Sequence, residues 1–520
     1  MNRTVSIIGA GPGGLAAAML LAKAGVDVTV HEARDVIGGR SSTLTAPTPQ
    51  GTFRFDTGPT FFLYPRVLAD IFAACGRDLD DEVELIRLDP QYHIVFEGGG
   101  AIQATGNMER MAAEIARFSP ADARALGRFM ADNRAKLAVF RPVLEGAFNG
   151  MRDLMRPPIL KGLSKLRPHR SVDSDLGTYF KDERIRLAFS FQSKYLGMSP
   201  FRCPSLFTIL SFMEYEYGVY HPRGGTGAVM AAMARVARDL GAKIVLNDRV
   251  EEILFTGRRA TGVRTRTGTT EADALVIGSD FAQTMTNLVP DRIRKRWTDK
   301  KIASKKFSCS TFMLYLGIEG DLPDLSHHTI YLAEDYRKNL ADIEAGLAPE
   351  NPSFYVQNAC VTDPALAPPG HSTLYVLVPV GHRMGESPDW ATLAPRYRAL
   401  TLERLKRLGI PDIENRIRFE KILTPQGWED ELQIYRGATF NLAHNLGQML
   451  HFRPRNRFED LDGVYLVGGG THPGSGLPVI FESARISTRL MAEDLGLDAH
   501  WDAPSKMASP DYIPAIAEAL

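Results

Sequence analysis

Residues 9–14 read Gly-Ala-Gly-Pro-Gly-Gly and have the spacing G-x-G-x-x-G. A glycine turn of this spacing between a strand and a helix lets the backbone approach a pyrophosphate at the N-terminus of the helix. Glu32 lies eighteen residues after Gly14, at a position where a carboxylate can accept hydrogen bonds from ribose hydroxyls. We therefore expect Gly9, Gly11, Gly14 and Glu32 to bind a dinucleotide, either NAD or FAD.

The segments around this turn have the apolar patterns of one βαβ unit. Residues 5–8 and 26–31 are short apolar runs typical of buried strands, and residues 15–24 are a helix-forming run rich in Ala and Leu. The same patterns farther along the chain predict helices at 228–240 and 393–408, strands at 243–246, 274–277, 312–316 and 374–380, a hairpin at 250–266, and a strand and glycine turn at 464–470 that opens a helix at about residue 481.

Four further segments combine glycine or proline with polar residues. Gly38-Gly39-Arg40 and Phe55-Asp56-Thr57-Gly58-Pro59 follow Glu32. Residues 221–227 read His-Pro-Arg-Gly-Gly-Thr-Gly, and residues 468–478 read Gly-Gly-Gly-Thr-His-Pro-Gly-Ser-Gly-Leu-Pro. So many glycines cost backbone entropy unless the exposed backbone is used, and we therefore expect several of these turns to contact the cofactor.

Together these segments resemble the bacterial and fungal type of the phytoene desaturase family, which includes the diapophytoene desaturases and lies in the flavin amine oxidase superfamily. The resemblance extends from residue 5 to about residue 495. It implies that FAD is the cofactor, that Arg40 pairs with phosphate, and that the backbone of Val250 holds the adenine. The other cofactor contacts that it implies are those of Gly38, Gly39, Gly58, Pro59, Gly468, Gly469, Gly470, Gly476, Leu477 and Pro478.

Three side chains are candidates for the chemical step. Asp153 and Arg156 lie in a segment that resembles the family segment proposed to face the substrate cavity, and His472 lies in the last glycine cluster. A solvated helical face explains the first pair equally well, and a lone loop histidine is more often a hydrogen-bonded structural residue. We keep Asp153, Arg156 and His472 as catalytic candidates with these alternatives open.

The predicted fold class is α/β, with a glutathione-reductase-like (Rossmann-type) FAD-binding domain, a discontinuous α+β substrate domain and a helical membrane-contact subdomain. The chain is longer than a single hydrophobic core supports, and the strand patterns recur at its start, middle and end. We expect the FAD-binding domain at 1–80, 206–300 and 446–497, the substrate domain at 81–110 and 301–445, the helical subdomain at 111–205, and a C-terminal tail at 498–520.

The amino-acid composition limits the classes of partner that the protein could have. Lys plus Arg equals Asp plus Glu at 61 each, so no overall field would attract nucleic acid. The four cysteines show no spacing typical of a disulfide framework or a metal site, which fits a reducing cytoplasm. No charge-free apolar run of membrane-spanning length is present. We therefore expect a cytoplasmic protein without a metal ion that could still lie on a membrane.

The resemblance implies desaturation of a long polyene such as phytoene or diapophytoene, with hydride transfer to the flavin N5. A hydrocarbon offers no charge to bind, so an apolar tunnel should set the specificity. We predict five aromatic residues as its lining, although core packing is the common alternative for each: Phe61, Phe62, Phe207, Phe212 and Tyr215.

The substrate is dissolved in the bilayer, so the enzyme must touch the membrane to collect it. Residues 152–170 hold six basic residues and one acid, Asp153, among apolar side chains. Interfacial segments combine apolar area with attraction to anionic lipid. This segment is our candidate for a peripheral contact with the cytoplasmic face of the membrane, and a solvated helix is the alternative.

Several alternatives stay open. The segment at 476–485 departs from the G-I-P-G-V form associated with phytoene desaturases and looks closer to relatives that act on thirty-carbon diapophytoene. A flavin amine oxidase, a carotenoid isomerase, a late-pathway carotenoid oxidase and a non-enzymatic lipid carrier share the fold. No second nucleotide motif is visible, so we expect oxygen or a membrane quinone as the electron acceptor.

Overall fold

A parallel sheet of five strands carries the predicted dinucleotide-binding turn. In the computed structural model, which describes residues 3–385, 388–501 and 505–508, the sheet order is β10-β2-β1-β14-β20. All four pairings are parallel. Residues 502–504 and 509–520 of the predicted tail lie outside the described part. The strands are β1 (Thr4–Ile8), β2 (Asp27–His31), β10 (Lys243–Val245), β14 (Ala274–Ile277) and β20 (Val464–Leu466).

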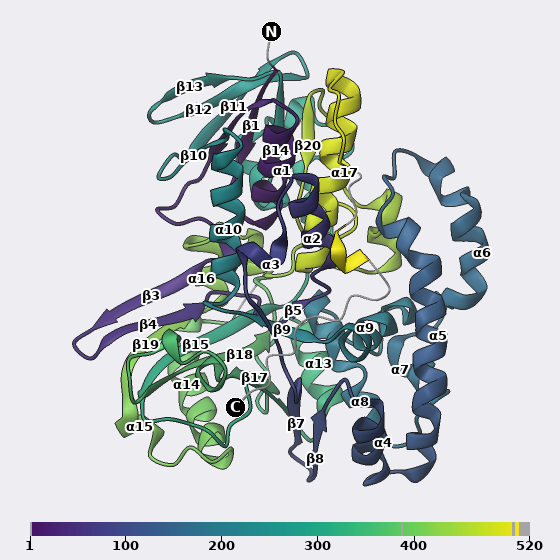
Figure 1. Cartoon of the computed structure of the whole chain (residues 1–520), viewed down its shortest axis with the longest axis vertical. Helices are drawn as coiled ribbons and strands as arrows, with labels where there is room; N and C mark the ends of the chain where they lie inside the picture. Colours follow the sequence, from purple (N-terminus) through teal and green to yellow (C-terminus); the bar gives the residue numbers. More distant parts are fainter. Residues whose placement is uncertain (1–2, 386–387, 502–504, 509–520) are drawn as a thin grey trace.

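Three helices pack together on one face of this sheet, namely α1 (Pro12–Lys23), α10 (Thr226–Asp239) and α17 (Leu477–Leu495) (Figure 1). The other face is covered by the antiparallel strands β11 (Val250–Thr256), β12 (Arg259–Thr265) and β13 (Gly268–Glu271) and by helix α11 (Phe281–Leu288). Because alternate side chains of a strand point to opposite faces, the short central strands can be apolar throughout. Strands separated by hundreds of residues thus share one core.

Two helices begin earlier than their apolar patterns predicted. Helix α1 begins at Pro12 instead of residue 15, and α17 begins at Leu477 instead of residue 481. In both helices a proline occupies the first turn, where its missing N–H is no loss and its fixed φ suits a helix. The earlier start brings the helix N-termini up to the glycine turns that precede them.

A second, mixed sheet forms the lower layer in Figure 1. Its order is β19-β15-β18-β17-β16-β7-β8, and the predicted strands at 312–316 and 374–380 lie in the centre of β15 and in the C-terminal part of β18. Helix α14 (Trp390–Arg407) packs against it. The strands are β7 (Tyr92–Phe96), β8 (Ala101–Ala104), β15 (Ser310–Glu319), β16 (His328–Leu332), β17 (Phe354–Gln357), β18 (His371–Val380) and β19 (Ile417–Leu423).

Helices gather on the right of Figure 1. They are α4 (Met108–Ala116), α5 (Pro120–Leu144), α6 (Pro157–Leu166), α7 (Val172–Leu176), α8 (Glu183–Ala188) and α9 (Ile209–Tyr217), with the short 3-10 helices η2 (Met151–Met155), η3 (Phe191–Leu196) and η4 (Ser205–Thr208). Their core is continuous with that of β7 and β8. Near the cofactor-binding half, smaller sheets pair β3 (Thr43–Thr48) with β4 (Gly51–Asp56), and β5 (Phe62–Leu63) and β6 (Leu85–Arg87) with β9 (Val219–Pro222).

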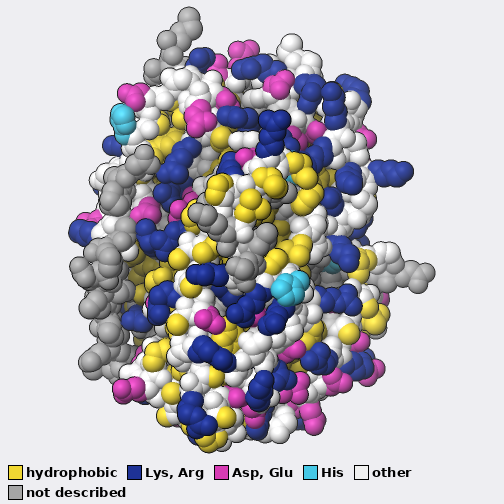
Figure 2. Space-filling model, turned by 90° about the vertical axis from the view of Figure 1, so that its right-hand side faces the viewer, with side chains coloured by type: hydrophobic (Ala, Val, Ile, Leu, Met, Phe, Trp, Pro, Cys, Tyr) yellow, Lys and Arg dark blue, Asp and Glu magenta, His cyan; other side chains and the backbone are white. Residues whose placement is uncertain are grey.

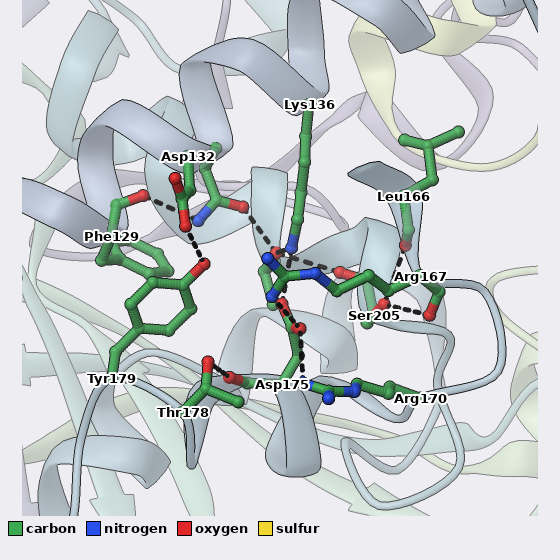
Figure 3. Close-up of polar contacts among 12 residues, drawn as sticks. Phe129, Asp132, Lys136, Leu166, Arg167, Arg170, Asp175, Thr178, Tyr179 and Ser205 are labelled. Carbon is green, nitrogen blue, oxygen red and sulfur yellow. Dashed lines mark hydrogen bonds and ion pairs between the residues drawn. The ribbon is translucent and has the colours of Figure 1, made fainter. Parts of the chain in front are cut away.

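A buried ionic network fastens these helices to one another (Figure 3). The ammonium of Lys136 on α5 lies 2.6 Å from the carboxylate of Asp175 on α7, and both side chains are buried. Arg167 donates to the other oxygen of Asp175 at 3.0 Å from the loop after α6, and Arg170 lies within 3.8 Å. The network thus connects α5, α7 and the end of α6 in the half of the molecule that the cofactor motifs do not reach.

Candidate functional site

The main cavity of the described residues has a volume of about 800 Å³ and is lined by both halves of the molecule. One end is formed by the glycine turns after β1 and β20, and the other by aromatic and aliphatic side chains of the helices and the mixed sheet. Pockets of this size hold cofactors and their substrates. The predicted cofactor residues Gly9, Gly11, Glu32, Gly39, Arg40, Gly58, Pro59, Val250, Gly468, Gly469, Gly470, Gly476, Leu477 and Pro478 line it.

The first glycine turn fits a pyrophosphate. A Cβ atom built on Gly11 would have no atom within 4 Å, so this side of the turn is open to the cavity. A Cβ on Gly14 would overlap the carbonyl oxygen of Gly9, so only glycine lets α1 pack this close to β1. Gly14 therefore acts through packing without lining the cavity. The free N–H groups at the start of α1 face the open side, where a phosphate would be stabilised.

Glu32 directly follows strand β2, beside this turn. One carboxylate oxygen accepts a hydrogen bond from the backbone N–H of Ala10 at 2.8 Å, and the other accepts one from Arg34 N–H at 3.0 Å. The side chain is buried yet lines the cavity, so its free lone pairs can accept the ribose hydroxyls. Glu32 thus also holds the glycine turn in place before any ligand binds.

The G-G-R turn lies against the same cradle. The N–H of Gly38 donates to the carbonyl oxygen of Ala10, and Gly38 has a φ of 100°, which favours glycine. Arg40 lines the cavity and donates to the carbonyl of Thr439 at 2.8 Å. Burial lowers the pKa of Arg40, and the nearby carboxylate of Asp280 opposes this effect. A partly buried guanidinium at this place can pair with phosphate, as the resemblance implied.

The last glycine cluster forms the N-terminus of α17 at the cavity wall. Gly476 has a φ of 117° and precedes Leu477, the first residue of the helix. A Cβ on Gly470 would overlap the side chain of Phe281, so glycine is needed for the backbone to pass this close. The N–H of Gly468 donates to Ser483 at 2.8 Å. The cluster therefore places bare backbone and the side chains of Leu477 and Pro478 against the cavity.

The motif at 221–227 has a structural task in this arrangement. Asp56 accepts hydrogen bonds from the N–H and hydroxyl of Thr226, the first residue of α10, at 2.7 and 2.9 Å. A Cβ on Gly225 would collide with the same carboxylate. Neither Asp56 nor Gly225 lines the main cavity. The motif thus anchors the segment that carries Gly58 and Pro59 to helix α10, where a carboxylate at the N-terminus is favourable.

The aromatic end of the cavity differs in part from the prediction. Phe61 and Phe207 line it, whereas Phe62, Phe212 and Tyr215 are buried in the core and do not. The prediction for Phe62 is wrong because successive side chains of an extended strand point to opposite sides. Phe62, the first residue of β5, therefore points away from the cavity that the preceding Phe61 lines. The wall also contains residues that no sequence motif indicated, among them Leu137, Phe140, Phe191, Tyr195, Leu210, Met213 and Tyr355.

His472 lies at the cavity wall with its imidazole in the protein interior. Its Nε2–H donates to the carbonyl oxygen of Val143 at 3.2 Å, and Phe148 packs on the ring edge-to-face. Burial lowers the pKa of His472 to about 3, so the ring is neutral. This geometry matches the structural alternative, and a catalytic role of His472 stays a prediction.

Asp153 and Arg156 form a pair with each other outside the cavity lining. Arg156 donates to Asp153 at 2.6 Å, and Asp153 also accepts from the N–H groups of Asn149 and Gly150. These bonds and Arg156 outweigh partial burial and lower the pKa of Asp153. The structure brings this pair together at η2 and the residue that follows it, and does not bring it to the cofactor turns. Its catalytic role likewise stays a prediction.

Comparison with known proteins places the chain in a family. A model for flavin containing amine oxidoreductases matches residues 12–494. The chain is 42% identical to a 4,4'-diapophytoene desaturase (4,4'-diapolycopene-forming) of Methylomonas sp, across 95% of this chain and 96% of that one. It is 39% identical to an all-trans-zeta-carotene desaturase of Myxococcus xanthus, across 95% and 94%, and 35% identical to a lycopene-forming phytoene desaturase of Pantoea ananas, across 95% and 100%.

Solved structures share the fold at low sequence identity. An oxidoreductase from Methanosarcina mazei has a TM-score of 0.61 at 19% identity, covering 94% of this chain and all of its own. Putrescine oxidase bound to putrescine has a TM-score of 0.60 at 18% identity, covering 95% and 99%. These likenesses confirm the predicted α/β flavoprotein fold. The chain belongs to the flavin containing amine oxidoreductase family, and within it to the carotenoid desaturases, with FAD as its cofactor.

Proposed function

We propose that this chain is an FAD-dependent desaturase that introduces conjugated double bonds into an acyclic polyene. The observation that carries the proposal is the main cavity of the described residues, which is lined both by the glycine turns and by a wall of aromatic and aliphatic side chains. FAD, when bound, supplies an acceptor for a hydride at N5. The residues of the chain would hold the cofactor, exclude water and align the hydrocarbon, and the depth of the apolar end would limit the length of hydrocarbon that fits.

Among polyenes, we propose 4,4'-diapophytoene before phytoene as the substrate. The relative that is 42% identical is named for the thirty-carbon compound, and the segment at 476–485 departs from the phytoene form. Phytoene is the runner-up because relatives of 35–36% identity are named for it. An isomerase, a late-pathway oxidase and a lipid carrier remain as other outcomes of the same assay.

The test is to incubate the purified protein with FAD and liposomes that carry either hydrocarbon, without nicotinamide. Product chain length and double-bond number are followed by chromatography and absorbance. New conjugated absorbance from diapophytoene, with little from phytoene, is the expected result. A flavin-loaded protein that yields no new double bond from either substrate would contradict a desaturase. The same assay under nitrogen, with and without a quinone, tests our further proposal that oxygen or a membrane quinone accepts the electrons.

We also propose that η2 and α6 touch the cytoplasmic face of the membrane. The apolar side chains of Met151, Met155 and Leu160 are 57%, 66% and 45% exposed, and Phe452 lies on the neighbouring segment. Figure 2 looks onto this side of the molecule and shows apolar side chains gathered in the upper middle, with Lys and Arg side chains around them. No helix among the described residues is long and apolar enough to cross a membrane.

Vesicle flotation tests this contact. A variant with Met155→Ser and Leu160→Ser loses part of the apolar area, so we expect weaker binding to vesicles that contain anionic lipid. Its flavin content should equal that of the unaltered chain, because both side chains lie far from the glycine turns in sequence and outside the cavity lining. A matched control, Leu347→Ser, removes an exposed apolar side chain elsewhere. Equal binding of all three proteins would contradict the proposal.

A further inference from the structure

A buried carboxylate lies behind the cavity wall and has no place in the cofactor site. Glu214 on α9 is fully buried. One of its oxygens accepts hydrogen bonds from the hydroxyl of Tyr92 on β7 and from the amide of Gln192 on η3, both at 2.9 Å. The hydroxyl of Tyr215 lies 3.2 Å from that of Tyr92. The carboxylate thus lies where the helices meet the mixed sheet.

The second oxygen of Glu214 is the unusual one. This atom is buried without a hydrogen-bond partner of good geometry, and the same is true of the hydroxyl of Tyr195. The Tyr195 hydroxyl nevertheless lies close enough to the carboxyl to lower its pKa. Two buried polar atoms left in this state cost free energy, which makes the pair a candidate for a role other than stability.

Tyr195 connects this carboxylate to the cavity. Its side chain lines the cavity, and its ring centre is 5.3 Å from that of Phe61, which follows the predicted flavin contacts Gly58 and Pro59 by two residues. Phe61 in turn stacks on His328, with ring centres 4.1 Å apart. Glu214 itself does not line the cavity. The Tyr195 side chain therefore lies at the cavity wall, while its hydroxyl is buried beside Glu214.

The charge environment suits a group that gains and loses a proton near neutral pH. Burial raises the pKa of Glu214 to about 7, and hydrogen bonds from Gln192, Tyr195 and Tyr92 oppose this effect. The titratable groups that face it are tyrosines, Tyr92 and Tyr215 besides Tyr195, and burial raises the pKa of each. An acceptor with a pKa near the working pH is the most effective general base.

We propose that Tyr195 and Glu214 take up the proton that the polyene loses in each desaturation step. The inference rests on the proposed function. Two hydrogens leave neighbouring carbons: one departs with its electron pair to the flavin, so the polyene is oxidised and the flavin reduced. The other departs as a proton, and its C–H electron pair becomes the new double bond. The Tyr195 oxygen accepts this proton while its own O–H proton passes to ionised Glu214, leaving a neutral tyrosine and a carboxylic acid.

In this arrangement Tyr195 is the residue that touches the substrate, and Glu214 is a positioning residue that acts through it. Glu214→Gln keeps the size and the hydrogen-bonding capacity of the side chain and removes its proton affinity. We expect kcat in the liposome assay to fall roughly 100-fold or more, with KM unchanged, because hydrocarbon binding needs no charge. Tyr195→Phe should lower kcat in the same way.

The pH profile separates this role from a structural one. In the unaltered protein kcat should fall about tenfold per pH unit below pH 7, because Glu214 must be ionised to accept the proton. Glu214→Gln should lose this step. Infrared titration of the flavin-loaded protein without substrate gives a second readout: a carboxylic acid C=O band that titrates near neutral pH and is absent in Glu214→Gln. In Tyr195→Phe its midpoint should move up, since a hydrogen bond to the ionised form is lost.

Glu216→Gln is the matched control, because Glu216 is on the same helix and pairs with Arg134 at the surface. It should keep the kcat, the pH profile and the infrared band. Asp153→Asn tests the competing candidate. An active protein in which Glu214→Gln keeps the normal kcat and pH profile, or in which only Asp153→Asn loses activity, would overturn the inference alone. An unaltered protein that forms no product overturns the proposed function and the inference together.

Discussion

At the scale of single residues, buried carboxylates of this chain carry different tasks. Glu32 fixes the glycine turn through two backbone N–H groups and still faces the cavity. Asp56 binds the N-terminus of α10, and Asp175 balances buried cations. The neighbouring groups that set the pKa of Glu214 are all neutral, which explains why burial has the largest effect on that pKa. The same side-chain type thus serves as a cap or a counter-ion, or in our proposals as a cofactor ligand or a proton acceptor, according to what surrounds it.

The first residue-scale prediction concerns cofactor retention. Glu32→Arg places a cation at the expected ribose position and removes the acceptor of the Ala10 N–H. We expect the purified variant to carry little or no FAD, measured by absorbance after gel filtration. Glu271→Arg makes the same charge change on exposed strand β13 and should keep its flavin. Full flavin content in Glu32→Arg would mean that the cofactor site is assigned wrongly.

The second residue-scale prediction concerns the pH dependence of stability. Because the pKa of Glu214 is raised to about 7 in the folded state, the unfolded chain ionises at lower pH and the folded chain keeps its proton. The free energy of unfolding should therefore decrease as pH rises from about 4.5 to 7, by roughly 3 kcal/mol from this group. Urea unfolding at both pH values should show that Glu214→Gln lacks this decrease. Identical pH slopes in the two proteins would contradict it.

At the scale of elements, the helices on the right of Figure 1 depend on one ionic network. Asp175 is fully buried and has three basic neighbours, Lys136, Arg167 and Arg170. Lys136 has Asp175 and the hydroxyl of Thr208 as its partners, and Figure 3 shows its side chain extending toward Asp175. Removing one partner of a buried ion pair costs much more than the pair contributes, because the remaining charge stays in a poorly polarisable interior.

The network predicts that removing the anion destabilises the protein more than removing one of its cations. Asp175→Asn leaves the buried ammonium of Lys136 without its counter-ion and should destabilise the protein by roughly 3–5 kcal/mol. Lys136→Met should cost less, because Asp175 keeps Arg167 and Arg170. Asp342→Asn, which breaks an exposed pair with Lys338, should change little. Chemical denaturation of the three variants measures the order, and a Lys136→Met loss as large as that of Asp175→Asn would contradict the argument.

At the scale of the whole molecule, the cofactor site joins pieces of chain that lie far apart. The cavity is lined by residues from 8 to 482, drawn from both sheets and from the helices. A ligand bound there contacts the folded state only, so its binding free energy adds to stability. FAD should therefore act as a structural link between the parallel sheet, the G-G-R turn and α17.

This linkage can be measured by thermal unfolding. At about one hundred times its dissociation constant, FAD should add about 2.7 kcal/mol and raise Tm of the flavin-free protein by roughly 2–3 °C, with a further rise at higher concentration. NAD shares the ADP half and lacks the flavin, so it should raise Tm less. An equal rise with NAD would indicate that the flavin end of the cavity contributes nothing.

Local patterns were enough to predict most of the glycine turns that line the cavity. The turn at 9–14 and the late glycine cluster could be read because each is contiguous and its glycines have one physical reason, close backbone approach. The strands at 274–277, 312–316 and 374–380 were found within a few residues, since apolar runs mark buried strands. The starts of α1 and α17 were predicted too late, because the apolar pattern does not include the first turn, where each helix has a proline.

The sequence by itself determined the dinucleotide unit, the family and the FAD, because these depend on contiguous residues whose chemistry is fixed by type and spacing. Only the tertiary structure decided which aromatic rings face the cavity, that Asp56 reaches α10, and that Glu214 lies behind Tyr195. Those facts depend on the side to which each strand or helix turns and on contacts across more than a hundred residues. Local sequence patterns carry no information about such contacts, because the contacts are set by the packing of the folded chain.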